Sequence, residues 1–131
     1  MGSFVGEQEI RVLIVDDDTS ILKAFRGILE RAGYSVETAE TGKEALEKLR
    51  KEKFNVCLVD VKLPDMDGTE LLLKIPKDDE TVKIIITGFS SEEVGKRAAD
   101  YGADDYLVKP VKPEDLLATI QERLDQLEIN C

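Results

Sequence analysis

Short runs rich in β-branched residues recur along the chain, and segments with helical spacing lie between them. The ends of the runs fall roughly 20 to 30 residues apart, the repeat length of a strand followed by a helix rather than of a hairpin. The runs are IRVLIV (10–15), SVETA (35–39), NVCLV (55–59), VKIIIT (82–87) and DYLV (105–108). This alternation predicts an α/β fold, with a parallel sheet covered by helices on both faces.

Helix boundary signals fall in the gaps between these runs. A hydroxyl residue followed three positions later by an acid forms a capping box, and two such pairs occur, Thr41 with Glu44 and Ser90 with Glu93. Proline at a first helical position and glycine after a last one mark further boundaries. The residues concerned are Gly33, Gly102 and Pro113. Pro76 follows closely on ELLLK, so we expect the third helix to be short.

Five strands joined by right-handed crossovers favour a doubly wound five-stranded parallel sheet in the order 2-1-3-4-5, a flavodoxin-like (βα)5 fold. The length of 131 residues fits one domain. We expect this domain to span residues 10–128 and to follow a disordered N-terminal segment, residues 1–9.

Composition excludes several classes of function. The chain has no histidine, which rules out Ser-His-Asp and Cys-His catalysis and H-E-x-x-H zinc sites. The net charge of −10 argues against direct binding of nucleic acid. We interpret Cys57 as a buried thiol and Cys131 as an incidental terminal one. No signal peptide and no apolar run long enough to span a membrane is visible, so a reducing cytosol is the default location and a membrane partner is not expected.

Polar residues follow the strand runs at the points where they end. Asp16 and Asp17 follow the first run, Asp60 the third and Lys109 the fifth, while Thr87 ends the fourth. Since the carboxyl ends of parallel strands meet at one edge of a sheet, these side chains should share a rim. Clustered carboxylates repel one another, by about 4 kcal/mol for a pair 4 Å apart at a protein surface, and Mg²⁺ and a lysine would offset this repulsion. The set indicates phosphoryl chemistry, in which an aspartate oxygen can be the acceptor.

The stretches VLIVDDD, VDVKLPDMDG, IIITG and GADDYLVKP occur in this order over residues 10 to 127. In that order and spacing the chain resembles the CheY-like receiver domain of two-component response regulators. The resemblance implies that Asp60 accepts a phosphoryl group from a sensor histidine kinase or a histidine phosphotransfer protein. It implies Mg²⁺, or Mn²⁺, on Asp16, Asp17, Asp60 and the backbone carbonyl of Lys62.

The same resemblance implies the parts of a switch. Lys109 would pair with the phosphoryl oxygens, next to a cis Lys109–Pro110 bond. Thr87 would move toward the phosphoryl group and Tyr106 would follow it inward. Lys62 and Phe89 would tune the access of water, so autodephosphorylation is the one activity expected of a protein that is otherwise not an enzyme. Residues 90–125 would form the readout surface and, after phosphorylation, a homodimer interface in a cytoplasmic phosphorelay.

Two alternatives remain beside this reading. DMDGT (65–69) matches the D-x-D-G-T motif of haloacid dehalogenase-type phosphatases, with Asp65 as nucleophile and Asp67 as acid/base. That motif needs its first aspartate directly after a buried strand, whereas Asp65 follows Pro64, which cannot continue a central strand. We therefore expect Asp65 to be a loop residue and Asp67 to cap the third helix in a box with Glu70, with Gly68 allowing a tight entry. The other alternative is an interaction module with the same fold that is never phosphorylated.

Overall fold

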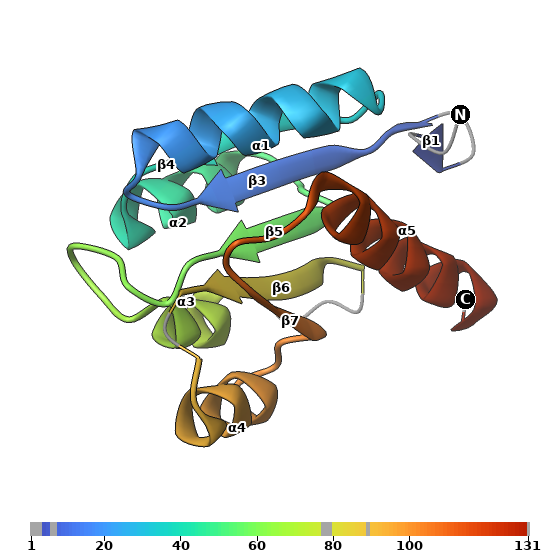
Figure 1. Cartoon of the computed structure of the whole chain (residues 1–131). Helices are drawn as coiled ribbons and strands as arrows, with labels where there is room; N and C mark the ends of the chain where they lie inside the picture. The colour runs from blue at the N-terminus through green and yellow to red at the C-terminus, as the bar shows by residue number, and fades with distance from the viewer. Residues whose placement is uncertain (1–3, 6–7, 77–79, 89, 131) are drawn as a thin grey trace.

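A five-stranded parallel sheet forms the centre of the protein (Figure 1). The computed structural model describes the backbone of residues 4–5, 8–76, 80–88 and 90–130. The strand order is β4-β3-β5-β6-β7. The strands are β3 (Arg11–Val15), β4 (Ser35–Ala39), β5 (Val56–Val59), β6 (Val82–Thr87) and β7 (Asp105–Val108). Because β3 is the first of the five predicted strands, this order is 2-1-3-4-5, and the predicted fold is confirmed.

Two layers of helices enclose the sheet. The helices are α1 (Thr19–Arg31), α2 (Gly42–Lys51), α3 (Gly68–Lys74), α4 (Glu92–Asp100) and α5 (Pro113–Asn130). Successive side chains of a strand point to opposite faces, so Val12 and Ile14 pack among residues of α1 and α5. Leu13 and Val15 pack on the other face, among residues of α2, α3 and α4. The central strands are therefore apolar on both faces, as expected for a parallel sheet covered on both sides.

Most of the predicted helix boundaries are confirmed. Thr41 caps α2, and its Oγ1 accepts a hydrogen bond of 3.0 Å from the N–H of Glu44. Pro113 opens α5. Gly33 and Gly102 follow α1 and α4 with φ angles of 94° and 103°, a left-handed conformation that favours glycine. The third helix is short, because α3 ends at Lys74, before Pro76.

The second predicted capping box is wrong. Ser91, and not Ser90, caps α4, and its hydroxyl accepts from the N–H of Val94. A shift of one residue places a valine at the third helical position, so Glu93 cannot complete the box.

Regular elements lie at both ends of the sheet domain. β1 (Phe4–Val5) and β2 (Gln8–Glu9) pair as a short antiparallel ladder within the segment 1–9. At the other end α5 continues to Asn130, two residues past the expected limit. The predicted limits of the domain stay a prediction. None of the helices in the described part of the chain combines the length and apolar character needed to cross a membrane.

Candidate functional site

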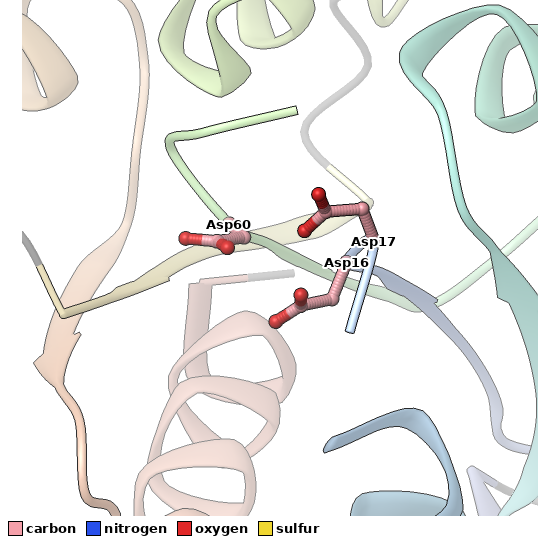
Figure 2. A group of neighbouring side chains, drawn as sticks. All are labelled: Asp16, Asp17 and Asp60. Atoms are coloured by element: carbon pink, nitrogen blue, oxygen red, sulfur yellow. The ribbon is translucent and has the colours of Figure 1, made fainter. Parts of the chain in front are cut away.

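Asp16 and Asp60 extend two neighbouring strands by one residue each at the same rim of the sheet. The N–H of Asp16 donates to the carbonyl of Ala39 over 3.0 Å, and the N–H of Asp60 donates to the carbonyl of Val15 over 2.9 Å. These backbone bonds hold both aspartates in the sheet ladder, side by side. Figure 2 shows these two side chains and that of Asp17 near one another, projecting to the same side of the strand ends. One oxygen of each of the three carboxylates lies within 4.8 Å of the others.

Lys109 reaches the same place from the end of β7. Its backbone N–H donates to the carbonyl of Thr87 over 2.9 Å, which continues the β6–β7 ladder into the rim. Its Nζ donates to Asp16 Oδ2 at 2.7 Å and to Asp60 Oδ2 at 3.3 Å. The Lys109–Pro110 bond is cis, as predicted. The structure therefore brings together the three predicted aspartates and the predicted lysine.

The pKa values of Asp60 and Lys109 are both raised, but for different reasons. Asp60 is 8% exposed and Asp16 is 3% exposed. Burial raises the pKa of Asp60, and the neighbouring charge of Asp16 raises it further, while Lys109 and the backbone N–H of Lys62 lower it by less. Burial alone would lower the pKa of Lys109, but hydrogen bonds and charges from Asp16 and Asp60 outweigh it and raise the pKa. Lys109 thus stays protonated and Asp60 is an unusually basic carboxylate.

The chemistry of these donors fits a hard divalent cation. All three side chains offer carboxylate oxygens, the ligands that Mg²⁺ prefers. Asp60 Oδ1 is buried and has no hydrogen-bond partner within the part of the chain that the structure describes, so it has capacity left for a cation or a new bond. Asp17 is exposed and would leave room for coordinated water. The carbonyl of Lys62 as a fourth ligand stays a prediction.

The two predicted switch residues lie on the adjoining strands. Thr87 ends β6 and is fully buried. Tyr106 lies in β7, and its buried hydroxyl makes no hydrogen bond to any described residue. Their proposed movements stay predictions. Phe89 lies outside the described residues.

The chain turns back tightly after Asp60. Gly68 opens α3 directly against the end of β5, where a Cβ atom would lie 1.9 Å from the carbonyl oxygen of Asp60. No side chain fits there, which confirms the predicted need for glycine. Asp67 caps α3 by accepting from the N–H of Thr69 over 2.8 Å, also as predicted. The predicted box with Glu70 is not seen among the described hydrogen bonds, and Asp67 pairs instead with Arg97.

Asp65 lies in the exposed part of this loop, away from the cluster of carboxylates. Its two carboxylate oxygens accept from the N–H groups of Gly42 and Lys43, each over 2.9 Å. These backbone bonds at the start of α2 lower the pKa of Asp65. Asp65 and Asp67 thus both bind helix N-termini, so the structure does not support the D-x-D-G-T phosphatase reading.

Two contacts of this loop were not predicted, those of Asp65 with α2 and of Asp67 with Arg97. The first had a usable signal, because helix N-termini in this fold lie at the same rim as the strand ends and attract carboxylates. The second joins two residues 30 positions apart and had no local signal.

Known proteins match nearly the whole chain. A family model described as "Response regulator receiver domain" matches residues 12–121. A CheY-like receiver domain protein from Methanospirillum hungatei JF-1 is 50% identical over 93% of this chain and 98% of that one, with a TM-score of 0.90. A response regulator from Burkholderia pseudomallei, solved with a phosphorylated aspartic acid and a calcium ion, is 29% identical over 93% of this chain and 72% of that one, with a TM-score of 0.82.

The curated relatives are longer proteins. The transcriptional regulatory protein ZraR of Escherichia coli (strain K12) is 37% identical over 88% of this chain. The chain spans between 26% and 50% of the length of the first curated relatives that it matches.

Proposed function

We propose that Asp60 is the phosphoryl acceptor of this chain, which belongs to the response regulator receiver domain family of two-component signalling. The observation that carries the proposal is the surroundings of Asp60, whose buried carboxylate is paired with the cation Lys109 and has an oxygen within 4.8 Å of the carboxylates of Asp16 and Asp17. A negatively charged acceptor and a negatively charged phosphoryl group can approach only where positive charge offsets both.

In the proposed reaction, an oxygen of Asp60 attacks the phosphorus of a phosphohistidine on a partner protein. The phosphorus–nitrogen bond breaks, its electron pair stays on the imidazole nitrogen, and an acyl phosphate forms on Asp60. Desolvation raises the pKa of Asp60, so its carboxylate is more basic than a solvated one and better suited to attack. Burial also limits the access of water to the acyl phosphate.

Lys109 has the role of a fixed cation. Its Nζ already donates to Asp60 Oδ2 and Asp16 Oδ2, and its raised pKa keeps it charged. A phosphoryl group on Asp60 would bring new oxygens within reach of the same ammonium group. Asp16, Asp17 and Asp60 would hold Mg²⁺ or Mn²⁺, which would supply charge neutralisation at the transferring oxygens.

The proposed partners are a sensor histidine kinase or a histidine phosphotransfer protein in the cytoplasm. We also propose that α4, β7 and α5 form the surface that changes on phosphorylation and that it pairs with a second copy of the chain. Val108 in β7 supports this choice, because it is a large apolar side chain that is 48% exposed. Sedimentation of the phosphorylated and unphosphorylated chains tests the pairing.

Intact mass spectrometry tests the acceptor. The chain is incubated with Mg²⁺ and acetyl phosphate, and wild type is compared with Asp60→Asn and Asp65→Asn. We expect one added phosphoryl group in wild type and in Asp65→Asn, none in Asp60→Asn, and none when the cation is chelated.

Loss of the added mass in Asp65→Asn alone would overturn the proposal in favour of the phosphatase-type nucleophile. No added mass in any variant, with acetyl phosphate and then with a phosphohistidine protein as donor, would leave an interaction module that is not phosphorylated.

A further inference from the structure

Helix α4 is held against the sheet by few apolar side chains. Ala98 is its one buried residue, and Val94 lies only partly buried. By contrast α1, on the other face, buries Leu22, Phe25 and Leu29. Since the free energy of burial grows with the apolar area removed from water, other contacts must contribute more to the position of α4.

Arg97 supplies such a contact at the N-terminus of α3. Its Nε donates to Thr69 Oγ1 and its Nη2 donates to Asp67 Oδ2, each over 3.0 Å. The two donors lie on one edge of the planar guanidinium, so the pair of bonds fixes its orientation as well as its distance. Among the described residues this is the one ion pair that α4 makes.

The two acceptors are themselves held in place. Thr69 Oγ1 donates to Asp67 Oδ1 over 2.6 Å, and the backbone N–H of Thr69 donates to the same oxygen over 2.8 Å. Thr69 is fully buried, so its hydroxyl has no freedom to turn toward solvent. Asp67 and Thr69 thus present Arg97 with a rigid acceptor of two oxygens.

This acceptor is joined to Asp60 by a short and closed piece of backbone. The N–H of Gly68, between Asp67 and Thr69, donates to the carbonyl of Val61 over 2.7 Å. The same Gly68 lies so close to the carbonyl of Asp60 that no Cβ would fit. Lys62 and Asp67 also form an isolated bridge across the loop. A displacement of the backbone at Asp60 therefore also displaces Asp67.

We propose that Arg97 is a positioning residue that couples the occupancy of the carboxylate site to the position of α4, through Asp67 and Thr69. The inference rests on the proposed function of Asp60. Binding of Mg²⁺ and a phosphoryl group at Asp60 shifts the loop 61–67, the two acceptor oxygens shift with it, and the guanidinium carries the shift into α4. By linkage, the position of α4 changes the affinity of the site by the same factor.

The strength of the contact suits a switch. The side chains of Arg97 and Asp67 are 32% and 34% exposed, so water screens the pair and the contact can break and re-form. A fully buried ion pair would fix α4 in one place. A solvated ion pair without the second hydrogen bond, from Nε to Thr69, would not fix the orientation of the guanidinium.

Arg11 offers a control outside the proposed switching surface. Its Nη2 donates to Glu52 Oε2 over 2.6 Å, with side chains that are 31% and 44% exposed, so this ion pair is partly exposed like the Arg97 pair. It joins the first residue of β3 to the residue that follows α2, and it does not touch the loop after Asp60. Arg11→Gln therefore removes a comparable ion pair without the proposed coupling.

Hydrogen exchange of the α4 amides, read by mass spectrometry over residues 92–100, tests the proposal. Each protein is measured alone and with Mg²⁺ and acetyl phosphate, and intact mass gives the phosphorylated fraction of the same samples. In wild type we expect loading to change the exchange rate of α4. We expect Arg97→Gln and Thr69→Val to reduce that change by roughly fivefold, a factor at the lower end of the range typical for coupling between two sites. Thr69→Ser, which keeps the hydroxyl, and Arg11→Gln should retain it.

The outcomes separate this inference from the proposed function. A phosphorylated wild type whose α4 exchange does not change overturns the coupling and leaves Asp60 as the acceptor. An α4 response that survives in both Arg97→Gln and Thr69→Val, or is lost equally in Arg11→Gln, also overturns it. Failure of wild type to take up a phosphoryl group, from acetyl phosphate and then from a phosphohistidine protein, overturns both. Circular dichroism shows whether each variant is folded. If Arg97→Gln is unfolded, Arg97→Lys takes its place, because lysine keeps the charge but lacks the paired Nε and Nη2 donors.

Discussion

Helices α1 and α5 are attached to the sheet in a different way from α2 and α4, which share the opposite face with α3. On one face α1 and α5 each bury three large apolar residues; they are Leu22, Phe25, Leu29, Leu116, Ile120 and Leu124. On the other face α2 and α4 each bury one apolar side chain, and in both helices it is an alanine. These residues are Ala45 in α2 and Ala98 in α4. Both of these helices are instead tied by polar contacts to the loop that follows Asp60.

The comparison indicates which parts of the molecule can move. Apolar burial holds α1 and α5 by several kilocalories per mole for each large side chain, and packing of that kind changes only if the core is disrupted. Exposed and half-exposed polar contacts stabilise by much less and can re-form in a new place. The face that carries α2 and α4 is therefore the one that a change at Asp60 can rearrange.

Truncation of one buried residue on each face is expected to give the largest effect. Leu29→Ala should lower the free energy of unfolding by about 2–5 kcal/mol, because Leu29 is fully buried. Ala98→Gly should lower it by about 1 kcal/mol, through lost helix propensity and one methyl group. Urea denaturation measures both. Equal losses would contradict the view that the two layers are held differently.

Glycine substitutions test how rigidly the loop after Asp60 is held. In Gly68→Ala the new Cβ meets a backbone atom, the carbonyl oxygen of Asp60, so we expect a loss of about 1–3 kcal/mol in the free energy of unfolding. In Gly42→Ala the new Cβ meets the side chain of Met66, which can change rotamer, and the loss should stay below about 1 kcal/mol. Thermal unfolding compares them. If Gly68→Ala loses no more stability than Gly42→Ala, the loop after Asp60 is less rigid than the proposed coupling to α4 requires.

Asp60→Asn should stabilise the protein at neutral pH in the presence of a chelator. Burial and Asp16 raise the pKa of Asp60, so the folded state holds this proton more tightly than the unfolded state. The stability of wild type then falls as the pH rises from the unfolded pKa through the folded one. We expect a gain on the order of 1 kcal/mol at pH 7, because the amide removes a buried charge and with it the repulsion by Asp16. Urea titrations at several pH values should show the gain shrinking to nothing in acid, and a loss at pH 7 would contradict it.

Asp65→Asn should have the smallest effect. The N–H groups of Gly42 and Lys43 lower the pKa of Asp65, so its stabilising contribution is present above the unfolded pKa and is lost as the pH falls through the folded one. A charge at a helix N-terminus stabilises by about 0.3–1 kcal/mol, and the amide should forfeit part of that at pH 7. The difference between wild type and Asp65→Asn should vanish in acid. A difference that is independent of pH would mean that the hydrogen bonds matter and the charge does not.

Much of the fold and most of the site could be predicted from local patterns. Strand and helix periodicity, with a few caps, predicted the five-stranded sheet. Right-handed crossovers left few strand orders, and 2-1-3-4-5 was predicted as the commonest of them for this length. Asp16, Asp17, Asp60 and Lys109 could be grouped because each lies within two residues of a strand end, and parallel strands end at one edge. The one-residue error at Ser90 arose because two adjacent serines can both cap a helix.

The sequence by itself determined where the carboxylates and the lysine of the site meet, because residues at strand ends inherit their neighbours from the order of the strands. Only the tertiary structure decided that Asp65 binds the start of α2 and that Arg97 binds Asp67 and Thr69. Such contacts depend on the distance and rotation between a helix and a loop, and packing of the whole layer sets both. No local pattern around Arg97 distinguishes it from the other charged residues of α4, since what selects it is the helix face that packing turns toward α3.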